Sequence, residues 1–145
     1  MIKNEKQYRI TKAQVRRFQD ALAEMEHQKK PVNVTPRLWK AQRDAAQSQL
    51  DDLQDEVAQY ERLHDGTRRD VVLEGVEDLP KALIRARIAA GMTQEALARR
   101  LGLKTQQIQR YEATDYESAS FGRMLRIVAA LGLRMPKAAR LVREQ

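Results

Sequence analysis

Apolar residues recur at helical spacing through the first part of the chain. Between Thr11 and about Gln28 the large apolar residues lie three or four positions apart, and most of the others are charged or polar. Thr11 and Gln14 have the spacing of a capping box, so the sequence predicts that this helix begins at Thr11. Residues 1–10 are expected to be loosely ordered, with at most a short extended piece. The apolar stripe of the helix consists of Val15, Phe18, Leu22 and Met25.

A second and longer helix is predicted after the break at Pro31. Thr35 and Pro36 are residue types favoured at the N-cap and in the first turn of a helix. The helix should extend to about His64, which makes it roughly 43 Å long against roughly 27 Å for the first. Its apolar stripe includes Ala46, Leu50, Leu53, Val57 and Tyr60. Residues 1–66 are therefore expected to form an antiparallel, coiled-coil-like helical hairpin.

The apolar stripes of the two helices make a narrow seam, which a lone hairpin leaves half exposed to water. A second copy of the chain could cover this seam in a four-helix arrangement, and we expect a homodimer on this ground. The alternatives are that the hairpin packs on the rest of its own chain or binds a different protein. The seam residues are therefore the candidate contacts with a dimer mate or a partner.

A polar linker is expected at residues 67–77. Its only apolar run, Val71–Leu73, is compatible with a short strand between subunits or with plain extended chain. Asp78 can cap a following helix, and Pro80 is tolerated in its first turn. Residues 78–145 then form the second predicted domain, with a last helix at 137–144.

The stretch 92–112 predicts two short helices joined by a tight turn. Thr93 can cap the first helix, Gly102 can end it with a positive φ, and Thr105 can cap the second. In the second helix Ile108 and Tyr111 share one face. The positions on its other face are Thr105, Gln106, Gln107, Gln109 and Arg110. Amide and guanidinium groups can form paired hydrogen bonds with adenine and guanine in the major groove, so this pattern is typical of a helix-turn-helix.

Charge is divided unevenly between the two predicted domains. Residues 1–78 hold 14 Lys or Arg and 15 Asp or Glu, a net charge of −1. Residues 79–145 hold 13 Lys or Arg and 5 Asp or Glu, a net charge of +8. The positive charge therefore coincides with the candidate DNA-binding motif, as phosphate binding requires.

Residues 79–133 resemble the Cro/repressor-type (XRE-like) helix-turn-helix family. The resemblance rests on Leu83-x-x-Ala86-Arg87, on Gly91-Met92-Thr93-Gln94-x-x-Leu97-Ala98-x-x-Leu101-Gly102-Leu103, on Ile108-x-x-Tyr111-Glu112 and on Leu131-Gly132-Leu133. It implies an all-α chain whose carboxyl-terminal part is a five-helix, lambda-repressor-like domain. It also implies that Gln94 contacts a phosphate and a base, and that Arg87 and Glu112 form a partly buried ion pair. Family members usually continue with Asn-Gly after that Glu, whereas this chain has Ala113 to Ala119.

The expected function is that of a sequence-specific DNA-binding transcription regulator, by default a repressor, that binds a palindromic operator as a dimer. The expected DNA-binding residues are Thr93, Gln94, Lys104, Thr105, Gln106, Gln107, Gln109 and Arg110. An antitoxin that holds a toxin through its hairpin and regulates its own operon is the alternative.

Other classes of function find little support in the sequence. The chain has no cysteine and two isolated histidines, and no nucleophile–base pair or phosphate-binding loop stands out, so neither an enzyme nor a metal or other cofactor is expected. The acidic residues Asp51, Asp52, Asp55 and Glu56 are interpreted as a solvated helix face. No apolar run suits a membrane span or a signal peptide, which favours a cytoplasmic protein.

Overall fold

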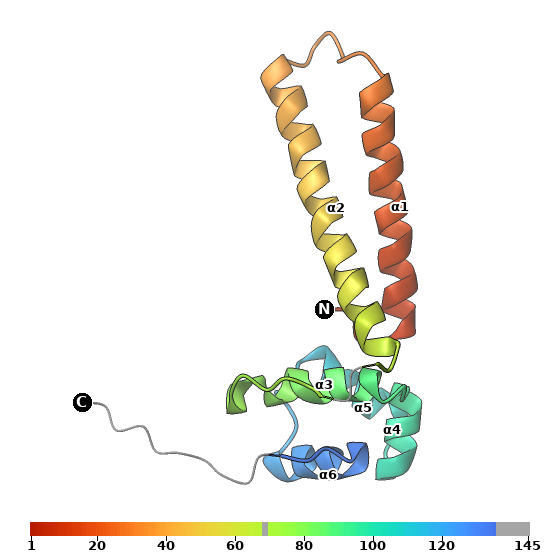
Figure 1. Ribbon diagram of the computed structural model, residues 1–145, viewed down its shortest axis with the longest axis vertical. Helices are drawn as coiled ribbons and strands as arrows, with labels where there is room; N and C mark the ends of the chain where they lie inside the picture. Colours follow the sequence, from red (N-terminus) through yellow and green to blue (C-terminus); the bar gives the residue numbers. More distant parts are fainter. Residues whose placement is uncertain (68–69, 136–145) are drawn as a thin grey trace, which may run out of the picture. The chain divides into compact units, whose positions relative to one another are not determined.

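The computed structural model describes residues 1–67 and 70–135, and all of its regular elements are helices (Figure 1). The chain divides into two compact units, Met1–Arg69 and Asp70–Gln145. The first holds helices α1 (Glu5–His27) and α2 (Pro36–His64). The second holds a short 3₁₀ helix, η1 (Val76–Asp78), followed by α3 (Leu79–Ala89), α4 (Gln94–Leu101), α5 (Thr105–Ala113) and α6 (Phe121–Leu131). The expected last helix at 137–144 lies outside the described residues.

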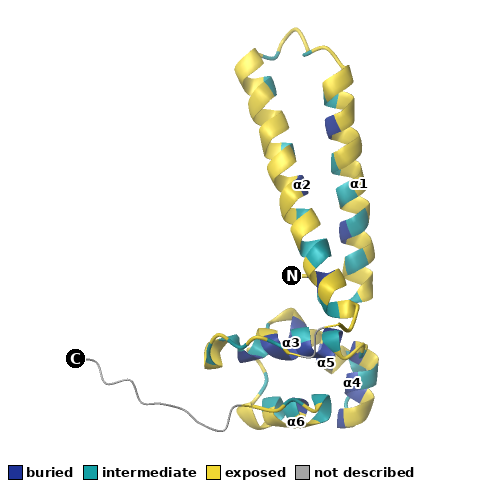
Figure 2. Cartoon of the chain, viewed as in Figure 1, coloured by how far each residue is buried: buried dark blue, intermediate teal, exposed yellow. Residues whose placement is uncertain are grey.

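The amino-terminal unit is an antiparallel helical hairpin (Figure 1). As predicted, α2 begins after Thr35, whose hydroxyl accepts a hydrogen bond from the backbone N–H of Leu38, and it ends at His64. Few residues of the hairpin are buried, and the long outer faces of both helices are exposed (Figure 2). The hairpin therefore has a thin core.

The predicted start of the first helix is wrong. The helix begins at Glu5, because the side chain of Asn4 accepts a hydrogen bond from the backbone N–H of Gln7. The Gln7 side chain in turn accepts one from the backbone N–H of Lys3, so Asn4 and Gln7 provide the cap that the sequence suggested for Thr11 and Gln14. Thr11 lies within α1, six residues after its first residue, and is buried. With 23 residues α1 is about 34 Å long.

In the second unit, α3 is the most buried helix, and α4, α5 and α6 surround the same core (Figure 2). Leu83, Ile84, Leu97, Ile108 and Ile127 have no exposed surface and make up its aliphatic centre. Burying a side chain of this kind contributes about 1.5–3 kcal/mol. This core holds the four helices in the arrangement that a helix-turn-helix requires.

The segment before α3 differs from one expectation and agrees with an alternative of another. Residues 71–73 have no regular secondary structure, which matches the plain-chain alternative. The Asp78 side chain does not cap α3 but binds the Arg85 guanidinium, with an Oδ2–Nη2 distance of 2.6 Å. Arg85 also donates to the carbonyl oxygen of Val72 at 3.0 Å, which ties the segment before the helix to its second turn.

No helix within the described ranges combines the length and the apolar character needed to cross a membrane.

Candidate nucleic-acid interface

Helices α4 and α5 are joined by a tight turn. Hydrogen bonds and one left-handed glycine fix where α4 begins and ends. The Thr93 hydroxyl accepts from the backbone N–H of Ala96 at 3.0 Å and caps α4, as predicted. Gly102 ends α4 with φ of 65°, in the left-handed region where an L side chain is strained. The backbone N–H of Leu103 then donates to the carbonyl of Ala98 at 2.9 Å, so α5 starts in a fixed direction.

The start of α5 differs from the predicted one by one residue. Lys104 is the N-cap and Thr105 is the first helical residue. The side-chain oxygen of Gln107 accepts from the backbone N–H of Lys104 at 3.0 Å, and the backbone N–H of Gln107 donates to the Lys104 carbonyl at 2.9 Å. Gln107 therefore has a structural bond as well as an exposed position.

Helix α5 has a buried face and an exposed face. Ile108 and Glu112 are buried, and Tyr111 is half-buried. The exposed face carries the residues that the sequence assigned to base recognition: Gln106, Gln107, Gln109 and Arg110 are exposed, and Thr105 is partly exposed. Lys104 and Thr93 are exposed at the starts of α5 and α4. These side chains together offer amide, hydroxyl and cationic groups to a ligand that α5 approaches.

A buried ion pair joins α3 to α5. Arg87 donates from Nε to Glu112 Oε1 at 2.5 Å and from Nη2 to Oε2 at 2.7 Å, with 3% of Arg87 and none of Glu112 exposed. Arg87 Nη1 also donates to the carbonyl oxygen of Met92 at 2.8 Å, at the turn before α4. This fork-to-fork geometry fixes the orientation of α5 because both partners are out of water.

Gln94 belongs to the same buried cluster. Its Nε2 donates to Glu112 Oε2 at 2.7 Å, and only 8% of the residue is exposed. In the sequence analysis, Gln94 is assigned to DNA binding. In the structure its side chain joins the start of α4 to the last turn of α5. A polar residue at the start of a helix is expected to be exposed. Gln94 is buried because its side chain donates to Glu112, a carboxylate 18 positions away in the sequence.

The loop between α5 and α6 contains a residue that sequence reasoning missed. Asp115 and Tyr116 have φ of 46° and 61°, which is uncommon for residues other than glycine. Tyr116 is nevertheless 2% exposed, stacks on Tyr111 with ring centroids 6.0 Å apart, and donates its backbone N–H to the Tyr111 carbonyl at 2.7 Å. The loop that replaces the usual Asn-Gly is thus held by an aromatic side chain packed under α5.

The Tyr116 hydroxyl is buried and has no hydrogen-bond partner in the described part of the chain. Burial, and the nearby Glu112 carboxylate, raise the pKa of the Tyr116 phenol well above its usual range, so it stays protonated. In the sequence, the one sign that Tyr116 packs against α5 is the presence of a single aromatic residue among mostly polar loop residues.

Two arginines lie in the last turn of α4, beside the motif. Arg100 donates to the carbonyl oxygen of Ala130 at 2.9 Å, and Arg99 pairs with Glu95 at 2.9 Å on the exposed surface of α4. Both arginines are exposed, so they can also meet phosphates.

The predicted seam lies between the two helices of the hairpin. Leu22, Leu50 and Tyr60 are buried, whereas the others are half-buried: Val15, Phe18, Met25, Leu53 and Val57. At its open end, Tyr8 stacks on Tyr60 with centroids 5.0 Å apart and donates its hydroxyl to Glu61 at 2.5 Å. Here too the sequence missed the contribution of Tyr8, because residues 1–10 were not expected to be helical.

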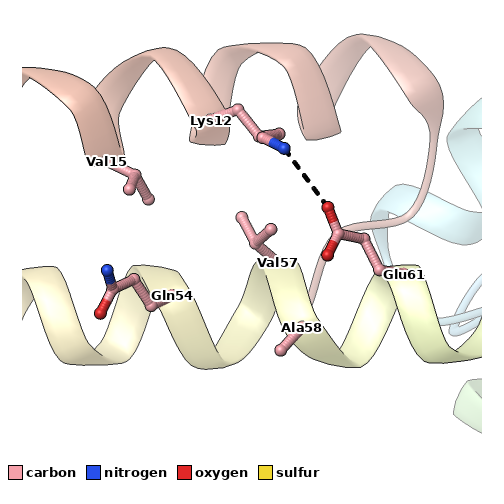
Figure 3. Close-up of a pocket in the computed structure, with 6 residues that line it drawn as sticks. All are labelled: Lys12, Val15, Gln54, Val57, Ala58 and Glu61. Atoms are coloured by element: carbon pink, nitrogen blue, oxygen red, sulfur yellow. Dashed lines mark hydrogen bonds and ion pairs between the residues drawn. The ribbon is translucent and has the colours of Figure 1, made fainter.

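A groove of about 230 Å³ opens beside the seam (Figure 3). Val15 and Val57 point into the space between the helices, and Lys12 reaches Glu61 across it at 3.4 Å. Gln54 and Ala58 complete the lining. The hydrogen bonds from Tyr8 and then Lys12 hold the pKa of Glu61 below its usual value, although burial acts in the other direction.

The comparison with family models agrees with this geometry. A model described as helix-turn-helix matches residues 83–137, which span from within α3 to beyond the end of α6. No curated protein and no solved structure matches the chain. The match confirms the resemblance expected from the motifs around Arg87, Gly102 and Glu112. Residues 83–137 therefore carry a helix-turn-helix domain that is similar to those of the Cro/repressor-type family of DNA-binding regulators.

Proposed function

We propose that the chain is a sequence-specific transcription regulator, acting as a repressor, that binds a palindromic operator as a homodimer. The observation that carries this proposal is the exposed polar face of α5, held in place from behind by the buried Arg87–Glu112 pair. A helix used for base recognition has to be presented rigidly, because bidentate hydrogen bonds to bases tolerate little error in position.

Base recognition falls to the exposed side chains at the start and on the outer face of α5. Gln106 and Gln109 carry amides that suit adenine, and Arg110 carries the guanidinium that suits guanine. Thr105 can add a hydroxyl contact, and Gln107 can contribute its amide nitrogen while its oxygen accepts from Lys104.

Phosphate contacts would set the register of the helix on DNA. Lys104 and Thr93 are exposed at the two helix starts, and residues 79–145 carry a net charge of +8. Each neutralised phosphate releases counterions, so affinity should fall steeply with salt. Contact of Gln94 with DNA is restricted by its burial, and we assign it a supporting position beside the contact residues.

A dimer supplies the discrimination that one recognition helix lacks. One such helix contacts only a few base pairs, whereas two helices about 34 Å apart meet successive major grooves on one side of DNA. The hairpin is the candidate dimerising unit, because its thin core leaves Val15, Phe18 and Val57 half-exposed. Repression follows if the operator overlaps a promoter.

The test is selection of bound fragments from a library of genomic and random DNA, followed by titration of the enriched sequence and a scrambled version. The proposal expects a two-fold symmetric site, an affinity at least about 10³-fold above that for scrambled DNA, and a steep decrease of affinity with salt. A library with no enriched sequence would contradict sequence-specific binding. An enriched site without two-fold symmetry would contradict the palindromic operator.

A further inference from the structure

The segment that precedes α3 is bonded to that helix by one arginine. Residues 70–74 have no regular secondary structure, and Val71 and Leu73 are half-buried whereas Val72 between them is exposed. This alternation is typical of an extended segment with one face covered. Arg85, in the second turn of α3, donates from Nη2 to the carbonyl oxygen of Val72 at 3.0 Å.

The same guanidinium also binds the far end of the segment. Arg85 Nη2 lies 2.6 Å from Oδ2 of Asp78, and Nη1 lies 3.5 Å from Oδ1. The pair is partly shielded from water, because only 25% of the Arg85 side chain and 18% of the Asp78 side chain are exposed. The hydrogen bond from Arg85 is the main reason why the pKa of Asp78 is below its usual value, although burial acts in the other direction.

Asp78 closes the turn that leads into α3. Its carboxylate accepts a hydrogen bond from the backbone of Glu74, and its backbone N–H donates to the carbonyl oxygen of Gly75 at 3.2 Å. Arg85 and Asp78 together therefore join residues 72–78 to one another and to α3. Substitution of Arg85 would remove both of the bonds described here that run from α3 to this segment.

This anchor shortens the connection between the hairpin and the DNA-binding unit. Helix α2 ends at His64 with Asp65 as its C-cap, and Val72 follows Asp65 by seven residues. At ~3.6 Å per residue or less, these seven residues reach at most about 25 Å. A chain held only from Leu79 onward would have fourteen residues after Asp65, and its reach would be about 50 Å.

We infer that Arg85 is a positioning residue for operator binding: by anchoring residues 72–78 on α3, it limits the separations of the two half-sites that the dimer accepts. This role rests on the dimer and the two-half-site operator of the proposed function. Moving the half-sites one further helical turn apart adds about 34 Å, or about 17 Å for each connection. That distance is most of the reach of the short connection and about a third of the reach of the long one.

The length of the connection can be measured without DNA. The chain has no cysteine, so Arg62→Cys on α2 and Ala129→Cys on α6, both at exposed positions, provide two sites for spin labels. An excess of unlabelled chain restricts the signal to distances within one copy. Pulsed electron paramagnetic resonance should give longer and more broadly distributed distances when Arg85→Ala is added. Arg85→Lys retains the charge without the planar fork, and its distances should lie between the two.

The functional test compares two operators, one with the best half-site spacing and one with the half-sites a helical turn further apart. The wild-type chain should bind the longer operator at least about tenfold more weakly. Arg85→Ala should bind the best-spaced operator about threefold more weakly, because effective concentration falls with about the 3/2 power of the length of the connection. At the longer spacing it should lose no more than about threefold further. A loss of stability alone would weaken binding to both operators equally and leave the ratio of the two affinities unchanged.

Two further variants serve as matched controls. Lys81→Ala removes a positive charge from the exposed surface of the same helix and should leave the ratio of the two affinities as in the wild type. An insertion of about seven Gly and Ser residues after Gly66 lengthens the connection while Arg85 stays in place. This insertion should reproduce both the longer label distances and the wider spacing tolerance of Arg85→Ala.

Equal label distances in Arg85→Ala and in the wild-type sequence would show that Arg85 does not set the length of the connection. Longer distances with an unchanged ratio of affinities would show that the connection does not set the operator spacing. Either result overturns the positioning role. A wild-type chain that binds one half-site as tightly as two contradicts the proposed function and the operator role together, whereas the label distances still decide whether Arg85 anchors the segment.

Discussion

Gln94 and Glu112 are 18 residues apart in sequence, yet the amide nitrogen of Gln94 lies 2.7 Å from the Oε2 atom of Glu112. The same oxygen accepts from Arg87 at 2.7 Å, so one carboxylate connects the start of α4 with the last turns of α3 and α5. Charge-assisted hydrogen bonds of this kind are stronger than neutral ones when water is excluded. The orientation of α5 is therefore fixed by three side chains.

Removal of Arg87 tests this brace. Arg87→Ala leaves the Glu112 carboxylate buried without its cation and should lower the free energy of unfolding of this unit by about 3–5 kcal/mol. Chemical denaturation followed by circular dichroism measures the change. The double variant Arg87→Met with Glu112→Leu should recover much of the stability, because it removes both charges. An unchanged midpoint in the single variant would contradict the importance of the pair.

Gln94→Ala should have a smaller effect. Glu112 keeps its two hydrogen bonds from Arg87 and loses one neutral donor, so we expect a loss of about 1–2 kcal/mol. Gln94→Glu places a second carboxylate beside the first and should be more damaging than the alanine. The stability of the two variants, measured in the same denaturant series, decides between bracing and a purely DNA-binding role. If Gln94→Ala weakens DNA binding at unchanged stability, the bracing role is wrong.

Substitutions on the exposed face of α5 should separate recognition from folding. Gln106→Ala should reduce discrimination between the operator and scrambled DNA by about 1–3 kcal/mol while leaving non-specific binding nearly intact. Gln107→Ala should do the same with a small loss of stability, because its side chain also accepts from the backbone of Lys104. Parallel titrations of specific and scrambled DNA measure both effects. An equal loss on the two DNAs would show that these residues contact no base.

Loss of the Tyr116 hydroxyl, unlike the substitutions above, is expected to maintain or increase the stability of the unit. Its hydroxyl is buried without a hydrogen-bond partner among the described residues, and the cost of such a group is about 1–3 kcal/mol. Tyr116→Phe keeps the packing on Tyr111 and should leave the unit equally stable or more stable by about 1 kcal/mol. Tyr116→Ala is the matched variant, and it should be strongly destabilising because it removes the ring. A clear loss of stability in Tyr116→Phe would show that the hydroxyl has a partner.

Most of the elements could be predicted from local sequence signals. Thr35, Pro36 and Gly102 restrict the backbone conformation at their own positions. As predicted, α2 begins after Thr35 and α4 ends before Gly102. The start of α1 was misplaced because Thr11 and Gln14 satisfy the same cap pattern as Asn4 and Gln7. Contacts with α2 distinguish the two starts, among them the packing of Tyr8 against Tyr60, which lie 52 residues apart in sequence.

Less of the candidate site could be predicted from the sequence, because part of it depends on contacts between distant residues. The exposed side of α5 follows from helical spacing, and Gln106, Gln109 and Arg110 are exposed as expected. The burial of Gln94 and the role of Tyr116 depend on tertiary contacts with Glu112 and Tyr111. Neither contact has a period or a spacing that a single sequence reveals.

The last prediction concerns the separate roles of the two units in folding and in dimerisation. The carboxyl-terminal unit has its own buried aliphatic core, so a chain lacking residues 1–66 should fold. Without the hairpin it should be a monomer, and each monomer meets a single half-site. Its affinity for a two-half-site operator should then approach its affinity for one half-site, a loss of at least about 100-fold, because the second contact is no longer linked to the first. Sedimentation and operator titration of the truncated and full-length chains measure both quantities. A truncated chain that still dimerises and binds as before would move dimerisation to residues 70–145 and leave the hairpin for another partner.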